Sequence, residues 1–499
     1  MQESMGWGAL LLQINAPVHA LPVDVFRVLA GLVGLAYFAR ILYDVPDLSS
    51  EDGLIDHGLC RRVFPPTRLS LFRPGIPTPV LRGVYACACL ASLALAVGFH
   101  PRIAAAGLFV IAVSAYRWNL FAVYVDDAIA HLLFFWVMLL PVGRTLTLEQ
   151  WHTNGYRFDP AWTEIVLPGA PVRAFLANMA LVYLVAGLYK FTSPMWRNGT
   201  ALAAILRLPV ARFPDVWKPR HSALLRAGNA WALVMEPLFA FMFISPVHSP
   251  LKWFLALSAA AFHVGIILTL KIPFANLAML GAIPVAMGPE MMLMGWGIAP
   301  PPVAETGPLG WNGIVGIALV ALLTSMVLWE LARSRGLSKL PLWKTHMSGF
   351  FGNPICVLLW LMGIAQSYRL FDWIDSRNYH VRYEVRAWAA QGSAEPETVD
   401  PKELFPGSLR HVLLQSYIFG NVWLQLTPEQ RAQVRESLLH RHAQRFARRH
   451  PGFRAVEVFA VTQRVTSDNL DLTSGQRSLL MRFDCLDGRA AVRHEARTA

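Results

Sequence analysis

Apolar runs of about 15 to 20 residues recur along most of this chain, separated by short polar stretches. Runs of this length can cross a hydrocarbon core about 30 Å thick as helices. We therefore predict a polytopic α-helical membrane protein with about nine transmembrane helices. The expected spans are 22–43, 77–99, one ending near 116, 128–140, one leading to Lys190, 228–245, 251–270, 273–288 and 310–329.

The pattern of apolar and polar residues changes after residue 369, where the long apolar runs give way to shorter alternating segments. Residues 379–389 alternate apolar with charged side chains, which is typical of a half-buried strand. Residues 427–430 form a capping box with proline at the first helical position, which predicts a helix start. Residues 455–461 and 478–483 indicate further strands. These features predict a small C-terminal α+β soluble domain.

The expected domain organisation follows from these two patterns. It comprises an interfacial N-terminal segment (1–21), a helical membrane domain (22–346), a membrane-side connector (347–374), the soluble α+β domain (375–490) and a polar tail (491–499). The basic stretch within 431–449 is expected to be a solvated helix face, with contact to substrate or lipid as the alternative.

Composition supports a membrane protein and excludes other classes. Charged residues make up 15% of the chain and apolar residues 55%, whereas soluble domains average about 25% charged. The net charge of +12 gives no argument for nucleic acid, because Lys and Arg gather in loops, as expected near anionic head groups. The five cysteines lack metal-ligand spacing, so no metal site is predicted. The apolar composition makes the lipid bilayer the expected partner.

One lysine stands out in the sequence ALVYLVAGLYKFTSPMWRNGT. Lys190 lies within a turn of an apolar run, and Pro194 and Trp196 follow it. A lysine placed there must snorkel, pair or serve a site. A buried lysine can act as a base, because burial lowers the pKa of an amine. The simpler alternative is a lysine that marks the end of a membrane helix.

The segment AGLYKFTSPMWRNGTAL resembles the region around the active-site lysine of vitamin K-dependent γ-glutamyl carboxylase. It also resembles the wider horizontally transferred transmembrane (HTTM) family. FRVLAGL, GFHPRIAA and AFHVGIILTLKIPFANLAML are similar to further segments of the family, in the same order. DSRNYHVRYEVRAW, followed by DPKELFPGSLRHVLLQSY, resembles the start of the carboxylase's lumenal domain. The resemblance therefore covers most of the chain.

The resemblance implies roles for individual residues. Lys190 falls on the base that activates reduced vitamin K, and His263 falls on a histidine of the same pocket. Tyr368 matches a pocket tyrosine, and His346 matches another pocket histidine with a different spacing. Asp126 occupies the position of the carboxylase's essential histidine, where the wider family often has an acid. This departure weakens the expectation of glutamate carboxylation more than that of the fold.

Trp196 and Arg27 complete the predicted quinone pocket. Arg27 lies inside the first span and needs a partner there, so a structural ion pair is the competing explanation for it. A carboxylate at Asp126 would stabilise a nearby ammonium, whereas a neutral imidazole would not. The sequence leaves open whether Asp126 pairs with Lys190, Arg117 or Arg27.

The function implied by the resemblance is that of an integral membrane enzyme. It would couple oxidation of reduced vitamin K or menaquinol by O₂, giving an epoxide, to proton abstraction and carboxylation with CO₂ of a peptide glutamate or other exported substrate. Its partners would be the membrane quinone and a secreted peptide or protein. One alternative is a quinone- or lipid-linked enzyme without carboxylation, which Asp126 favours. Another is a non-enzymatic membrane factor for export, assembly or immunity.

Two arguments about orientation disagree. The basic loops 191–226 and 331–346 would be cytoplasmic by the positive-inside rule. The resemblance implies the reverse, with Lys190 and the C-terminal domain on the periplasmic or lumenal face of the inner or plasma membrane. We adopt the resemblance, because a loop at an active-site face can carry basic residues that bind substrate.

Overall fold

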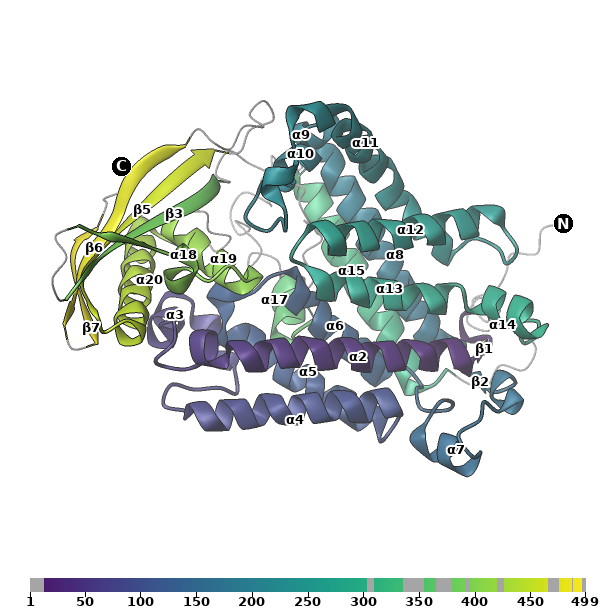
Figure 1. Ribbon diagram of the computed structural model, residues 1–499. Helices are drawn as coiled ribbons and strands as arrows, with labels where there is room; N and C mark the ends of the chain where they lie inside the picture. The colour runs from purple at the N-terminus through teal and green to yellow at the C-terminus, as the bar shows by residue number, and fades with distance from the viewer. Residues whose placement is uncertain are drawn as a thin grey trace.

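The computed structural model describes residues 13–302, 309–334, 354–364, 379–390, 395–419, 426–464, 475–486 and 488–495. The chain is mostly helical, and a five-stranded sheet near the C-terminus packs at one end of the helical bundle (Figure 1). The bundle contains α2 (Ala20–Asp44), α4 (Thr78–Val97), α5 (Pro101–Trp118), α6 (Val125–Leu139), α8 (Gly169–Thr192), α11 (Ser222–Leu238), α12 (Pro250–Thr269), α13 (Pro273–Ala286), α14 (Gly288–Trp296) and α15 (Trp311–Ser334).

Several of these helices are long and apolar enough to cross a membrane. Among the described residues, α2, α4, α8, α12 and α15 qualify, and the pair α13 and α14, bent by 58°, makes a sixth if it counts as one span. The protein is therefore an integral membrane protein, and the described part of the chain supplies five or six candidate spans. The helices α6 and α11 have only 15 and 17 residues, and α5 carries an arginine near each end.

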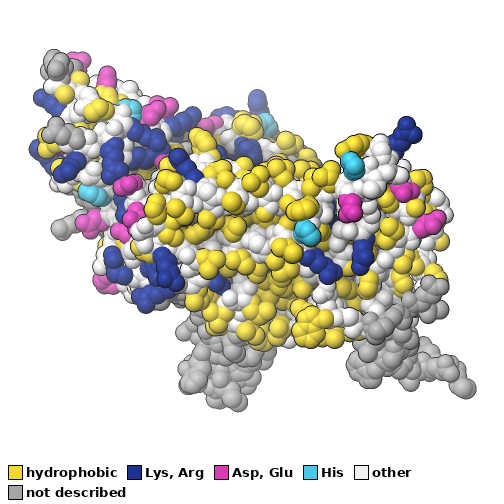
Figure 2. Space-filling view, turned by 90° about the horizontal axis from the view of Figure 1, so that it is seen from below, with side chains coloured by type: hydrophobic (Ala, Val, Ile, Leu, Met, Phe, Trp, Pro, Cys, Tyr) yellow, Lys and Arg dark blue, Asp and Glu magenta, His cyan; other side chains and the backbone are white. Residues whose placement is uncertain are grey.

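Local sequence explains where many bundle helices begin and end. Proline stands in the first turn of α4, α5, α12 and α13, where its missing N–H costs no hydrogen bond. Gly98 ends α4 with a φ of +76°, a left-handed conformation that favours glycine. A broad apolar surface covers the side of the bundle (Figure 2). Exposed large apolar side chains of the bundle helices include Leu90, Ile103, Leu257 and Leu268, which are available to lipid.

The sheet is antiparallel, with strand order β4-β3-β5-β6-β7. The strands are β3 (Tyr379–Ala389), β4 (Glu397–Val399), β5 (Phe453–Arg464), β6 (Gln476–Leu486) and β7 (Arg489–Glu495). Helix α20 (Pro428–Arg449) covers one face, and its N-terminus has the predicted capping box, with Thr427 accepting a hydrogen bond from the Gln430 N–H. The predicted strands and this helix are confirmed; β4 and β7 were not predicted. The short helices α18 (Pro401–Leu404) and α19 (Leu409–Ser416) lie beside them.

The sheet region packs directly on the bundle. Its apolar core continues into α3 (His57–Val63) and the short helix 120–122 of the bundle. Arg445 of α20 lies 2.6 Å from Asp47, in the acidic segment that follows α2, and Arg441 lies 3.8 Å from Asp56. The expectation of a solvated face is therefore wrong for this side of α20. Arg441 and Arg445 instead pair with acids of a segment nearly 400 residues earlier in the sequence.

A buried histidine in this region predicts acid sensitivity. His442 of α20 packs against Phe405, with ring centroids 5.0 Å apart, and its Nδ1 lies 2.7 Å from the carbonyl of Leu438, so Nδ1 carries the proton. Burial lowers the pKa of His442 to about 4, whereas an unfolded histidine titrates near 6.5. The unfolded state thus binds more protons below about pH 6.5, and we expect roughly 3 kcal/mol of stability to be lost as the pH falls to about 4.

Hydrogen exchange of the α20 amides at several pH values measures this loss. His442→Leu should flatten the pH dependence, whereas the same change at His440, which is exposed, should leave it unchanged. An unchanged pH dependence in His442→Leu would show that other groups cause the acid sensitivity.

Candidate functional site

Lys190 lies in the last turn of α8, and its side chain is buried. Its Nζ is 2.6 Å from Oε2 of Glu236 on α11, and the two side chains are only 4% and 6% exposed. The ring of Trp196, from α9 (Pro194–Arg197), lies 5.5 Å from the same nitrogen. The amine therefore points into the protein rather than to the membrane surface, between a carboxylate and an aromatic face that both favour a cation.

Close packing of α8 against α11 fixes this pair. Gly187 of α8 lies against Pro237 of α11, and a Cβ added at Gly187 would meet the proline Cδ at 2.4 Å. Glycine is thus required at this crossing, since any side chain would push the two helices apart. Lys190 and Glu236 lie within one turn of this contact on their respective helices, so the crossing sets the separation of the two charged groups.

A second polar group lies two turns earlier on α8. The hydroxyl of Tyr183 is 2.7 Å from Nε2 of His263, and Nδ1 of His263 is 2.7 Å from Oδ1 of Asn276. The Asn276 amide donates to the carbonyl of Ile272, so its oxygen accepts from the Nδ1–H of the histidine, whose Nε2 accepts from the tyrosine. His263 is therefore held neutral and in one tautomer. It does not contact Lys190, but it is linked through Tyr183 to the same helix.

Asp126 has a capping role in this structure. Its Oδ1 accepts a hydrogen bond of 2.8 Å from the N–H of Ala275, in the first turn of α13. The N-cap residue of α13 is Ile272, which has no side-chain acceptor, so a carboxylate from α6 takes over that function. Within the described residues, Asp126 forms none of the three ion pairs left open by the sequence. Lys190 pairs with Glu236 instead.

The other two candidate partners of Asp126 are engaged elsewhere. Arg117, in the last turn of α5, donates to the backbone carbonyls of Leu69, Trp360 and Leu361. It thereby holds the end of α5 against α17 (Pro354–Leu361). Helix α17 has eight residues, which is too short to cross a membrane.

Arg27 belongs to a polar network at the opposite end of the bundle. It pairs with Asp24 at 2.9 Å and donates to the carbonyls of Leu95, Ala96, Thr145 and Leu146. Asp24 in turn accepts from three backbone N–H groups, those of residues 143–145. Strand β2 (Val166–Leu167) pairs with β1 (Val18–His19) at the start of α2 and directly precedes α8. Lys190 lies 21 residues beyond Gly169, the first residue of α8, and 21 helical residues span roughly 32 Å. Arg27 thus lies far from Lys190.

An acid next to Asp126 connects the bundle to the C-terminal region. Asp127 accepts hydrogen bonds from the Tyr37 hydroxyl at 2.7 Å and from the guanidinium of Arg410, on α19. Lys271, between α12 and α13, donates to the carbonyls of Pro209 and Gly407, and burial lowers the pKa of this lysine. The segment around residue 408 is therefore held against the bundle near the N-termini of α6 and α13.

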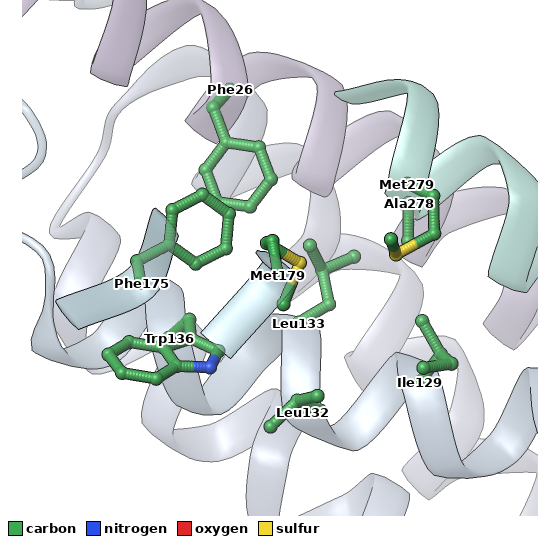
Figure 3. Close-up of a pocket in the computed structure, with 9 residues that line it drawn as sticks. All are labelled: Phe26, Ile129, Leu132, Leu133, Trp136, Phe175, Met179, Ala278 and Met279. Atoms are coloured by element: carbon green, nitrogen blue, oxygen red, sulfur yellow. The ribbon is translucent and has the colours of Figure 1, made fainter. Parts of the chain in front are cut away.

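A small apolar cavity lies in the bundle between α2, α6, α8 and α13. Figure 3 shows the side chains around it, and its volume is about 10 Å³. The lining residues are Phe26, Ile129, Leu132, Leu133, Trp136, Phe175, Met179, Ala278 and Met279. An apolar space of this size stays dry and is too small for a quinone ring. Met179, one of the lining residues, lies one turn before Tyr183 on α8.

The sequence-predicted site residues are therefore only partly brought together. Lys190 and Trp196 are adjacent, His263 reaches α8 through Tyr183, and Asp126 caps the helix that carries Asn276. Two further predictions, His346 and Tyr368, lie outside the described residues. Across the part of the chain that the structure describes, no cluster of three or more His, Cys, Asp or Glu side chains could hold a metal ion.

Sequence reasoning missed Glu236, Asp127 and Arg410. Glu236 could have been found, because it is the only charged residue of the apolar run 228–245, and an acid inside the membrane is the natural partner of a buried lysine. Asp127 and Arg410 are 283 residues apart, and no local pattern connects them.

Comparisons with known proteins do not add to this description. No protein-family model, no curated protein and no solved structure matches the chain. The residues and their geometry are thus the basis for a functional proposal, together with the resemblance of the sequence segments.

Proposed function

We propose that this protein is a membrane enzyme that oxidises a reduced quinone, similar to the vitamin K-dependent carboxylase. The observation that carries the proposal is the buried amine of Lys190, enclosed by helices and 2.6 Å from a carboxylate. Burying such a pair of charges is costly, and ionisable side chains inside a membrane protein commonly serve proton chemistry. The sequence segment around it resembles the carboxylase site, which favours a quinol over other weak acids.

The proposed chemistry assigns a task to each group. Lys190 Nζ accepts the proton of a quinol hydroxyl, and Trp196 contributes an aromatic face against which a planar ring can stack. The Tyr183–His263–Asn276 chain orders the helices behind the site. The apolar bundle excludes water from basic species. The quinol is a substrate drawn from the bilayer, and its oxidation by O₂ to an epoxide supplies the driving force for abstraction of a proton from a second substrate.

The leading form of the proposal includes carboxylation of a glutamate in an exported peptide or protein, with CO₂ as the second reactant. The site and the C-terminal region would then face the periplasm or the lumen. The carboxylase-like sequence 379–388 forms β3, so this part of the resemblance falls on a regular element of the sheet region.

A second candidate is quinol or lipid chemistry without carboxylation. The position of the carboxylase's essential histidine is held here by Asp126, whose oxygen is committed to the α13 N-terminus. If the Asp126 carboxylate took up a proton during turnover, it would weaken this cap and cost about 1 kcal/mol of helix stability. This observation favours a scaffold whose quinol half is kept and whose carboxylation half is absent.

Epoxide formation by purified protein in nanodiscs tests the proposal. Reduced vitamin K or menaquinol is supplied with O₂ and labelled bicarbonate, and the quinone epoxide and the label in a glutamate peptide are measured. We expect the wild type to form epoxide. Absence of epoxide from both quinols would overturn the proposal and favour a non-enzymatic membrane factor.

Asp126→His separates the two candidates. If the wild type forms epoxide and also labels the peptide, the carboxylase-like function is supported. If the wild type forms epoxide alone, the second candidate is supported, and labelling gained in Asp126→His would identify this residue as the cause. The variant loses one helix cap, so its melting temperature is measured in parallel to confirm that it is folded.

A further inference from the structure

The Lys190–Glu236 pair raises a problem for any base function of the lysine. An ammonium has three protons and no lone pair, so it cannot accept another proton. A buried carboxylate at 2.6 Å stabilises that charged form. Release of the proton to water would leave Glu236 as an isolated buried anion, which is strongly unfavourable. The lysine therefore needs an acceptor inside the protein.

We propose that Glu236 is that acceptor, and that the quinol proton reaches its carboxylate through Lys190. The inference rests on the proposed function and names a catalytic partner within the same site. The contact carries it: the Glu236 oxygen lies 2.6 Å from Nζ, and both side chains are more than nine-tenths buried.

The proton transfers balance at each stage. In the resting pair, Nζ carries three protons and Glu236 is ionised. One N–H bond breaks and an O–H bond forms on Oε2, which leaves a neutral amine beside a neutral carboxylic acid. The quinol O–H then breaks, its proton forms a new N–H bond on Nζ, and the ammonium becomes the counter-ion of the deprotonated quinol. The net charge of the buried group is zero throughout, so no stage places an unpaired charge in the apolar interior.

The packing of α8 and α11 suits this transfer. The Gly187–Pro237 contact lets the two helices approach closely, which places the donor and acceptor atoms within hydrogen-bond distance. Trp196 lies on the amine and can stabilise the cation when the carboxylate becomes neutral. A pair at this separation can pass a proton without a movement of the helices.

The chain contains a matched control. Lys252 of α12 and Glu290 of α14 form a second buried pair, 2.8 Å apart and 6% and 1% exposed. Lys252 lies 11 residues before His263 on α12, or about 16 Å along the helix. It joins α12 to the bent α13–α14 pair, and no part of the proposed site touches it. Glu290→Gln therefore makes the same chemical change in a pair that has no catalytic assignment.

The test uses full-length protein in nanodiscs without oxygen, so that turnover does not interfere. A reduced naphthoquinol is added, its ultraviolet absorbance reports deprotonation, and infrared difference spectra in H₂O and D₂O report a newly protonated carboxyl group. We expect both signals in the wild type and in Glu290→Gln. We expect the carboxyl band to be missing in Glu236→Gln and to reappear, shifted, in Glu236→Asp.

Turnover provides a second readout. Under air, Glu236→Gln should lower the epoxidation rate about 100-fold, a typical value for loss of a proton acceptor. Its residual rate should rise with pH, because Lys190 must then release its proton to water. Glu290→Gln should keep the wild-type rate and pH profile.

The outcomes separate the two proposals. If the wild type never deprotonates the quinol, the proposed function fails. If it does, but no carboxyl band forms or the band persists in Glu236→Gln, the assignment of Glu236 fails while the function stands. A purely structural Glu236 would give a destabilised variant with an unchanged pH profile and no carboxyl band in the wild type, which would also overturn the inference.

Discussion

Lys190→Met should abolish quinol epoxidation, lowering the rate by about 10²- to 10⁴-fold, the usual effect of removing a general base. Methionine fills most of the lysine volume but cannot accept a proton, so quinol binding should persist. The epoxide assay with saturating quinol measures the effect. A variant that keeps more than a tenth of the wild-type rate would contradict the role of Lys190 as the base.

The same substitution should also affect stability. The structure places Glu236 in a buried pair with Lys190. Removing one partner of a buried pair costs about 3–5 kcal/mol, because the other charge is left uncompensated. The double variant Lys190→Met/Glu236→Leu should recover most of this loss, since two apolar side chains replace the pair.

Thermal unfolding in detergent distinguishes these variants. We expect a lower melting temperature for Lys190→Met than for the double variant, while neither forms epoxide. Equal melting temperatures would show that Glu236 is neutral when the lysine is absent. The double variant also ensures that lost activity is not a consequence of lost folding.

The second large effect is expected at the opposite end of the bundle. Asp24→Ala removes the partner of Arg27, whose side chain is fully buried like that of Asp24, and the acceptor of three backbone N–H groups. We expect a loss of about 3–5 kcal/mol, again because a charge is left uncompensated. Glu384→Ala is the control, since Glu384 and Arg477 form a pair about half exposed, and such pairs contribute about 0–1 kcal/mol.

This comparison also decides between the two explanations of Arg27. A structural role predicts that Asp24→Ala lowers the melting temperature strongly, and that folded Arg27→Met protein retains normal quinol epoxidation. A role in the quinone pocket predicts a raised quinol KM in folded Arg27→Met protein. The carbonyls that surround the guanidinium favour the structural role.

Much of the architecture could be predicted because it depends on local patterns. Apolar runs gave the positions of the bundle helices, alternation gave β3, and the capping box gave the first residue of α20. Lys190 also stood out locally, as a charge at the end of an apolar run. Of the nine expected spans, five or six coincide with described helices that are long and apolar enough to cross a membrane, whereas others fall on shorter helices such as α6.

The partners of the polar residues could not be predicted in this way. Whether Asp126 faces a lysine or a helix N-terminus depends on how α6 packs against α13. The two residues in contact there, Asp126 and Ala275, are 149 positions apart in the sequence. The α20 arginines looked solvated because their acidic partners lie nearly 400 residues earlier, with Arg445 and Asp47 separated by 398 positions. Such pairings are set by the packing of whole elements and leave no periodic signal in the chain.

The docking of the C-terminal region has a consequence for the sidedness of the reaction. Leu409 packs against the apolar cluster that contains Trp196, and Arg410 reaches Asp127, so the sheet region and Lys190 share one end of the bundle. The aqueous compartment that surrounds the sheet is therefore the one nearest to the amine. A water-soluble acceptor would have to arrive from that compartment, and the quinol head group from the adjoining leaflet. Locating any exposed residue of β3 relative to the membrane thus locates the chemistry as well.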